Sequence, residues 1–207
     1  VLNVQHEDHR LTGRPCEAAV EVASGWGVFI ARPALIHRNL DSRLQLGFIA
    51  TSDGHRRNPG LGGGLTGIFA RELTPGAILE ALRERRVYAT NGSRVFLDAR
   101  LNGQLMGRHV RTRRSVELTL RVSAPKPLNT LALIRDGWEV RRIPAAGRKE
   151  WSGSFAEDLA DGYHWYYWRI EMEGTSPQYP GNLKAAEGHL AWSTPHFVSV
   201  GPEPEGR

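Results

Sequence analysis

The amino-acid sequence predicts an α/β region followed by an all-β region. Over residues 1–92, short apolar runs alternate with segments of helical periodicity, which is typical of a mainly parallel sheet covered by helices. Over residues 93–207, runs rich in β-branched and aromatic residues are separated by turn signals, which is typical of a small antiparallel β-sandwich. We therefore expect two domains, with a boundary after residue 92.

The α/β region opens with two predicted strands. Residues 18–24 (AAVEVAS) and 44–50 (LQLGFIA) are short and apolar, and the second has the unbroken apolar pattern of a fully buried strand. Residues 32–43 between them fit a loop and a helix, and we expect His37 on the surface of that helix.

The clearest helix signal lies in residues 73–86 (LTPGAILEALRERR). Thr74 is a suitable N-cap, and Pro75 occupies the first helical position, where its missing N–H is not needed. An apolar stripe follows, formed by Ile78, Leu79 and Leu82. The pattern predicts a helix that covers part of the sheet.

Five extended runs follow in the all-β region. The turn signals Asn102-Gly103 and Asp136-Gly137 predict tight hairpins. Residues 165–168 (WYYW) place aromatic rings on both faces of one strand, for which we favour core packing on one face and a domain contact on the other. The runs are residues 94–101, 115–124, 129–140, 163–173 and 189–200.

Composition restricts the chemistry available to the chain. Cys16 is the single cysteine, which excludes an intramolecular disulfide and a cysteine-based zinc site, so a metal would need His, Asp and Glu ligands. No window reaches the roughly 18 consecutive apolar residues of a membrane-spanning helix, so we expect no membrane partner. The compartment is left open, with the cytoplasm favoured.

The formal charge of +5 permits an anionic partner. Its sharpest basic cluster, residues 107–114 (GRHVRTRR), contains no aromatic residue and no nucleic-acid-binding motif. We favour a solvated loop there, and nucleic-acid binding is the weaker alternative. The arginines of this cluster are Arg108, Arg111, Arg113 and Arg114.

The strongest candidate site follows the second predicted strand, in the stretch LGFIATSDGHRRNPG of residues 46–60. Asp53 and His55 are two residues apart, so in extended chain they project to the same side at the strand's carboxyl end. A carboxylate beside an imidazole suits a divalent ion such as Zn, Mn or Fe. The alternative is an ordinary polar turn, which uses the same residue types.

Two neighbouring segments bear on this site. Residues 3–10 (NVQHEDHR) contain His6, which reaches the same site if residues 1–5 form a strand and belongs to an exposed turn if they do not. The glycines that follow His55 lack a complete phosphate-binding pattern, so we expect a flexible loop over the site. These glycines are Gly60, Gly62, Gly63 and Gly64.

An ordered series of motifs resembles the C-terminal half of PHP-type (polymerase and histidinol phosphatase) metallohydrolases, in the branch that includes carbaryl hydrolases. The series comprises TSDGH, a glycine-rich loop, ELT at a helix start, ALRERRVYATNG and NGQLMG, and the later LALIRDG and LAWSTPHF resemble that branch's closing β domain. The resemblance implies the C-terminal part of a (β/α)7 barrel followed by a β-sandwich.

The resemblance also implies roles for individual residues. PHP proteins hold two or three metal ions at the carboxyl ends of their strands, and Asp53 and His55 match the last pair of ligands. His6 matches an earlier histidine ligand, and Glu21 in VEVASGWG is a carboxylate that would face the site. Trp26 aligns with a position where some relatives carry a histidine.

The expected function is therefore metal-dependent hydrolysis of a small-molecule phosphoester or other ester, with Asp53 and His55 in the catalytic site. The opening His-x-His strand of the PHP barrel is missing, so we expect a fragment that lacks the N-terminal metal ligands. The alternative is a non-catalytic binding or structural module with a remnant metal site. The oligomeric state is left open.

Overall fold

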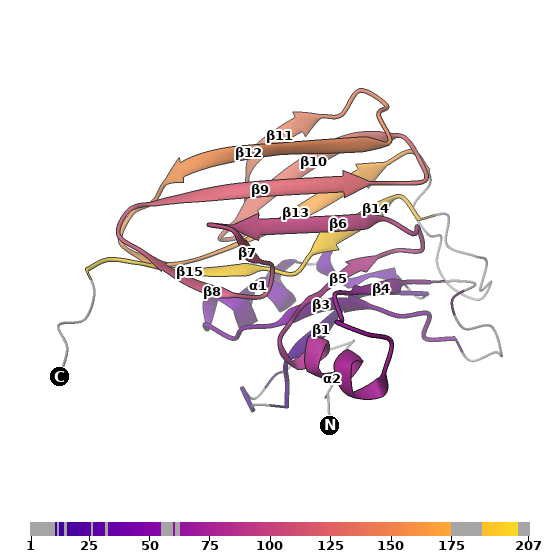
Figure 1. Ribbon diagram of the computed structural model, residues 1–207, viewed down its shortest axis with the longest axis horizontal. Coiled ribbons are helices and arrows are strands. Elements are labelled where there is room, and N and C mark those ends of the chain that lie inside the picture. The colour runs from indigo at the N-terminus through magenta and orange to yellow at the C-terminus, as the bar shows by residue number, and fades with distance from the viewer. Residues whose placement is uncertain are drawn as a thin grey trace.

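A computed structural model describes residues 11, 13–14, 16–25, 27–31, 33–54, 60, 63–174 and 188–202 (Figure 1). Within these residues the chain is mostly β-strand, arranged in three open sheets. In chain order the elements are β1 (Ala19–Ser24), β2 (Gly27–Val28), η1 (Phe29–Ala31), α1 (Pro33–Asp41), β3 (Gly47–Ala50), β4 (Leu65–Ile68), α2 (Pro75–Arg83), β5 (Val87–Thr90), β6 (Phe96–Leu101), β7 (Gln104–Leu105), β8 (His109–Thr112), β9 (Ser115–Ser123), β10 (Leu128–Arg135), β11 (Trp138–Pro144), β12 (Glu150–Asp158), β13 (Gly162–Met172), β14 (Leu190–Ser193) and β15 (His196–Val200).

The smallest sheet has the strand order β2-β1-β3, and β1 and β3 run parallel. Every residue of both strands is buried, as expected for apolar strands covered on both faces. The predicted strands at residues 18–24 and 44–50 are thus confirmed. Their parallel pairing brings both carboxyl ends to one edge of this sheet.

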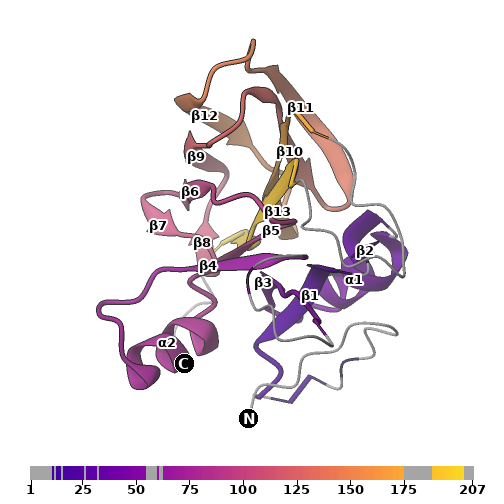
Figure 2. The same ribbon diagram turned by 90° about the vertical axis from the view of Figure 1, so that its right-hand side faces the viewer.

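The other two sheets are mainly antiparallel and form two layers, which fits the expected β-sandwich, although the larger sheet includes β4 and β5 from before residue 92 and the parallel pair β8 and β15. One contains eight strands, with β11-β10-β13-β14-β5-β4 along its main path and β15 and β8 branching from β13, and the other has the order β12-β9-β6-β7. β9 alternates strictly, with its apolar side chains buried between the sheets and its polar ones outside. Figures 1 and 2 show the two layers, with the small sheet and the helices below them.

The hairpins and the capped helix follow the sequence signals. Asn102-Gly103 and Asp136-Gly137 take positive φ at both positions, as a two-residue type I′ hairpin requires. At the start of α2, the Ala77 N–H donates to the Thr74 hydroxyl over 3.3 Å, which confirms Thr74 as the N-cap. Of the predicted apolar stripe, Leu79 is exposed, so α2 covers less of the sheet than expected.

A second hydrophobic core joins α1 and the small sheet to the outer face of the eight-stranded sheet. Trp165 and Tyr167 belong to this core, whereas Tyr166 and Trp168 lie between the sandwich sheets, so the expected two-sided packing of this strand is confirmed. His37 is half-buried and its Nε2 lies 3.1 Å from the Tyr167 hydroxyl, so the expected surface position is wrong. The helix face that carries His37 packs against β13.

Hydrogen bonds cross the expected domain boundary. β5 pairs with β14, so strands on both sides of residue 92 share one sheet. The Phe48 N–H in β3 also donates to the Thr194 hydroxyl over 2.8 Å. The division into 1–92 and 93–207 and the PHP-type barrel remain predictions, since the described strands include one parallel pair in the small sheet but no closed barrel. No helix in the described part is long and apolar enough to cross a membrane.

Candidate metal site at the end of strand β3

The candidate site lies where the parallel strands β1 and β3 both end. Beyond the last paired residues, the Thr51 N–H donates to the Ala23 carbonyl over 3.2 Å, and the Gly25 N–H donates to the Ser52 carbonyl over 3.2 Å. The two chains therefore stay side by side past the strands. The carboxyl edge of a parallel sheet is the usual location of ligand sites in open α/β folds.

Glu21 is the buried carboxylate of this edge. It pairs with Ile49 in the register of β1 and β3, and only 4% of its surface is exposed. The Thr51 hydroxyl donates to Glu21 Oε1 over 2.5 Å. A buried carboxylate requires such donors, because burial without hydrogen bonds is strongly unfavourable. Glu21 thus fixes the side chain of Thr51.

Thr51 in turn positions Asp53. The Asp53 N–H donates to Thr51 Oγ1 over 3.1 Å, so the threonine hydroxyl donates to Glu21 while it accepts from Asp53. Asp53 has φ 42°, in the left-handed region that aspartate tolerates better than most residues. These hydrogen bonds place the half-buried Asp53 directly after the strand, at the predicted position.

The second half of the glycine segment packs onto this edge. The Gly64 N–H donates to the Thr51 carbonyl over 2.7 Å. A Cβ on Gly63 would lie 2.8 Å from Ser52 Cα, and one on Gly64 would lie 2.9 Å from the Thr51 backbone nitrogen. These two residues pack closely on the strand end, because only glycine permits such close backbone contact. The flexibility expected of the loop stays a prediction.

The other predicted site residues lie outside the described part of the chain. This applies to His55, to His6, and to Trp26 and Gly62. Within the described residues, no group of three or more His, Cys, Asp or Glu side chains is close enough to hold a metal ion. The structure therefore brings Asp53 and Glu21 to one edge but does not test the predicted pairing of Asp53 with His55.

The donor chemistry at this edge fits a divalent ion in part. Carboxylate oxygens such as those of Asp53 are common ligands of Zn, Mn and Fe, and the imidazole nitrogens would come from His55 and His6. The sequence analysis missed the role of Thr51. The feature that could have indicated this role is its position, because Thr51 directly follows the apolar run and precedes Asp53 by two residues.

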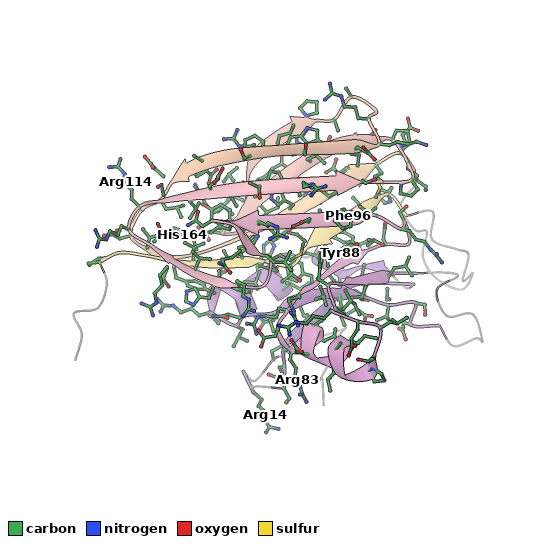
Figure 3. The ribbon with its side chains drawn as sticks, in the orientation of Figure 1. Arg14, Arg83, Tyr88, Phe96, Arg114 and His164 are labelled. Atoms are coloured by element: carbon green, nitrogen blue, oxygen red, sulfur yellow. The ribbon has the colours of Figure 1, made fainter. Side chains whose placement is uncertain are left out.

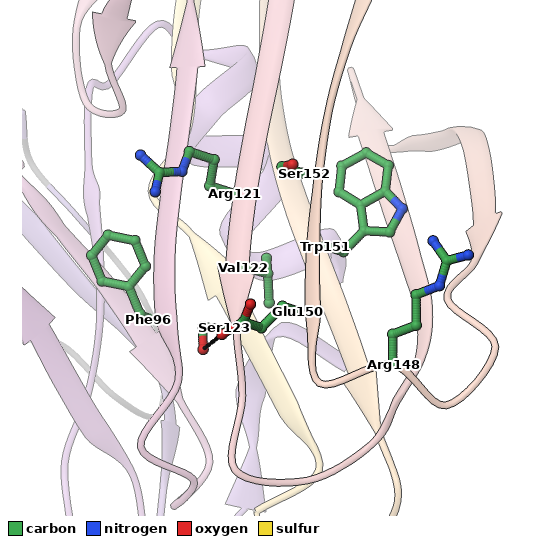
Figure 4. Close-up of a pocket in the computed structure, with 8 residues that line it drawn as sticks. All are labelled: Phe96, Arg121, Val122, Ser123, Arg148, Glu150, Trp151 and Ser152. Carbon is green, nitrogen blue, oxygen red and sulfur yellow. Dashed lines mark hydrogen bonds between the residues drawn. The ribbon is translucent and has the colours of Figure 1, made fainter.

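A separate hollow of about 370 Å³ lies on the four-stranded sheet (Figure 4). It mixes an exposed aromatic ring with charges of both signs, and Ser123 there donates to Glu150 over 3.4 Å. It lies on β6, β9 and β12 and contributes nothing to the β3 edge. Its lining residues are Phe96, Arg121, Val122, Ser123, Arg148, Glu150, Trp151 and Ser152.

Comparisons with known proteins give limited matches. A family model described as "Protein of unknown function (DUF3604)" matches residues 50–115, which include Thr51 and Asp53. A search of the curated proteins found no match. Among solved structures, the chain is similar to the crystal structure of a two-domain protein from Bacteroides vulgatus containing a predicted PHP-like metal-dependent phosphoesterase, with 17% identity and a TM-score of 0.35. The match covers 84% of this chain and 52% of that one, so the chain spans about half the length of that protein.

Proposed function

We propose that the chain forms part of a PHP-type metal-dependent hydrolase that acts on a small-molecule phosphoester or a related ester. The observation that carries the proposal is the position of Asp53, which lies in the turn after β3, the strand parallel to β1, and whose backbone N–H is held through Thr51 by the buried Glu21. The motif series around Asp53, from TSDGH to NGQLMG, supports the same assignment.

In this proposal Asp53 and His55 are the ligands at the end of β3, and His6 is a ligand from an earlier segment. A divalent Zn, Mn or Fe ion held there would supply Lewis acidity and a bound water as nucleophile for a phosphorus or carbonyl centre. Thr51 and Glu21 hold the backbone N–H of Asp53, and Gly63 and Gly64 allow the following segment to pack against the strand end.

The decisive experiment is elemental analysis of the purified chain, compared with an Asp53→Ala/His55→Ala variant. The matched control is Asp158→Ala/His109→Ala, which removes an exposed aspartate and an exposed histidine from the sandwich. We expect about one or more equivalents of Zn, Mn or Fe in the wild type and the control, and a loss of most of it in the site variant. Hydrolysis of p-nitrophenyl phosphate by the metal-loaded protein tests the reaction class.

If the wild type binds no metal, the same measurement is made on a fusion in which a PHP-type His-x-His strand precedes the chain. If the extended chain also binds no metal, the hydrolase proposal is wrong. A non-catalytic binding or structural module with a remnant site then becomes the better description. Equal metal loss in the site variant and the control would also contradict the assignment to Asp53 and His55.

A further inference from the structure

Strands β8 and β15 run parallel and end at the same place, at one end of the sandwich. Ser199 pairs with Arg111, and Val200 pairs with Thr112. The Gly201 N–H then donates to the Thr112 carbonyl over 3.2 Å, which closes the pair. A hollow of about 210 Å³ opens at these strand ends, lined by Arg111, Thr112, Arg113, Ser199, Val200, Gly201 and Pro202.

The four arginines of the basic cluster divide into two pairs. Arg108 lies 2.9 Å from a carboxylate oxygen of Glu84, and Arg114 lies 3.4 Å from one of Asp158. Figure 3 shows Arg114 at the outer end of the sandwich. By contrast, Arg111 and Arg113 are exposed and have no ion-pair partner within the described part of the chain. These two unpaired guanidinium groups are the ones that line the hollow.

The surroundings of the hollow add positive charge. Burial and the nearby cations Arg111 and Arg43 lower the pKa of the His109 imidazole. Arg43 itself stacks over the Tyr163 ring at 5.3 Å. The residues that line the hollow include Arg111 and Arg113 and no acidic residue. The lining of the hollow therefore carries positive charge only.

We propose that this hollow is a binding site for the phosphate group of a small molecule. Arg111 and Arg113 would each donate charge-assisted hydrogen bonds to the oxyanion, because a planar guanidinium matches phosphate geometry in two-point contacts. The Ser199 hydroxyl lies 2.9 Å from His109 Nε2. When His109 Nε2 carries the hydrogen and donates to Ser199, the Ser199 O–H is left to donate to the phosphate. This site shares no residue with the edge at Asp53 and does not depend on the proposed function.

The same observations favour a small ligand over a nucleic acid. A nucleic-acid track would use all four arginines, but Arg108 and Arg114 are paired with carboxylates. The residues that line the hollow include no aromatic ring on which a base could stack.

The test is calorimetric titration with inorganic phosphate and with glycerol phosphate, at constant ionic strength. The hollow variant is Arg111→Gln/Arg113→Gln, and the matched control is Arg108→Gln/Arg114→Gln. We expect saturable binding of one phosphate group per chain, weakened roughly tenfold or more in the hollow variant and by less than about twofold in the control. All four arginines are surface residues, and a thermal melt verifies that both variants fold.

The His109 ring provides a second reporter, observed by NMR. In the wild type, bound phosphate should raise the pKa of His109, because it offsets the cations that lower it. In the hollow variant phosphate should leave that pKa unchanged. Equal weakening in both double variants, or absence of saturable phosphate binding, would overturn the proposal. So would binding confined to a single-stranded oligonucleotide or to phosphatidic acid vesicles, with neither small phosphate bound.

Discussion

The hydroxyl of Thr51 lies 2.5 Å from Oε1 of Glu21 and donates a hydrogen bond to it. Glu21 lies within β1 and Thr51 directly follows β3, so the bond ties the end of β3 to the neighbouring parallel strand. Because Thr51 also accepts from the Asp53 N–H, the buried carboxylate determines where Asp53 lies. The strand end is thus held by side chains as well as by the sheet.

Replacing Thr51 with valine should loosen this strand end. Valine keeps the shape but removes the hydroxyl, so Glu21 and the Asp53 N–H both lose a partner. We expect a loss of about 1–3 kcal/mol in the free energy of unfolding, measured by urea titration, and faster hydrogen exchange of the Asp53 amide. Thr51→Ser retains the hydroxyl and should cost less than about 1 kcal/mol. A larger loss in Thr51→Ser than in Thr51→Val would show that the methyl group, and not the hydroxyl, is what matters.

Substitution of Gly64 by alanine tests the close contact of the glycine segment with β3. The new Cβ would meet the Ala50 side chain and lie 2.9 Å from the Thr51 backbone nitrogen, so the chains must separate. We expect destabilisation of about 1–3 kcal/mol. The matched control is Gly76→Ala in α2, where the new Cβ meets nothing within 4 Å and helix propensity predicts stabilisation of up to about 1 kcal/mol. Chemical denaturation of both variants would decide, and an unaffected Gly64→Ala protein would contradict the packing.

The buried imidazole of His196 should make the fold sensitive to acid. His196 is fully buried, and neither of its ring nitrogens has a well-formed hydrogen bond in the described part of the chain. Burial lowers the pKa of the imidazole to about 3, and the nearby Ala99 backbone opposes this effect only in part. The folded state therefore binds this proton more weakly than the unfolded state, whose value is near 6.5. Stability is full above pH 6.5 and falls as the pH drops from there toward 3, by up to about 1.4 kcal/mol per pH unit.

The measurement for His196 is the free energy of unfolding between pH 7.5 and pH 5, compared with that of His196→Leu. The other histidines contribute equally to the pH dependence of the free energy of unfolding in both proteins. The packing effect of leucine is the same at every pH, so the difference between the two pH dependences reports the imidazole of His196. We expect a shallower pH dependence in the variant. Parallel curves would mean that His196 finds a partner in the folded protein.

Local signals in the sequence were sufficient for much of the fold. Apolar runs indicate the strands β1 and β3, and a side-chain cap at Thr74 indicates the start of α2. Residues that tolerate a left-handed backbone indicate the turns at Asn102-Gly103 and Asp136-Gly137. All three signals act within a few residues. β12 was missed, because its inward positions hold Trp151, Gly153 and Phe155 and lack the β-branched residues of its neighbours. The expectation of a solvated loop over residues 107–114 was wrong for its middle part, where β8 pairs with β15 through backbone hydrogen bonds that no local signal indicates.

The sequence by itself thus determined the two strands and the capped helix, because backbone propensity and burial pattern are properties of neighbouring residues. Only the tertiary structure decided that Thr51 bonds to Glu21, that Gly64 packs onto β3, and that Arg108 and Arg114 are paired while Arg111 and Arg113 are not. Those contacts join residues on different elements, often far apart in the chain, and their partners are set by how the sheets and loops meet in space.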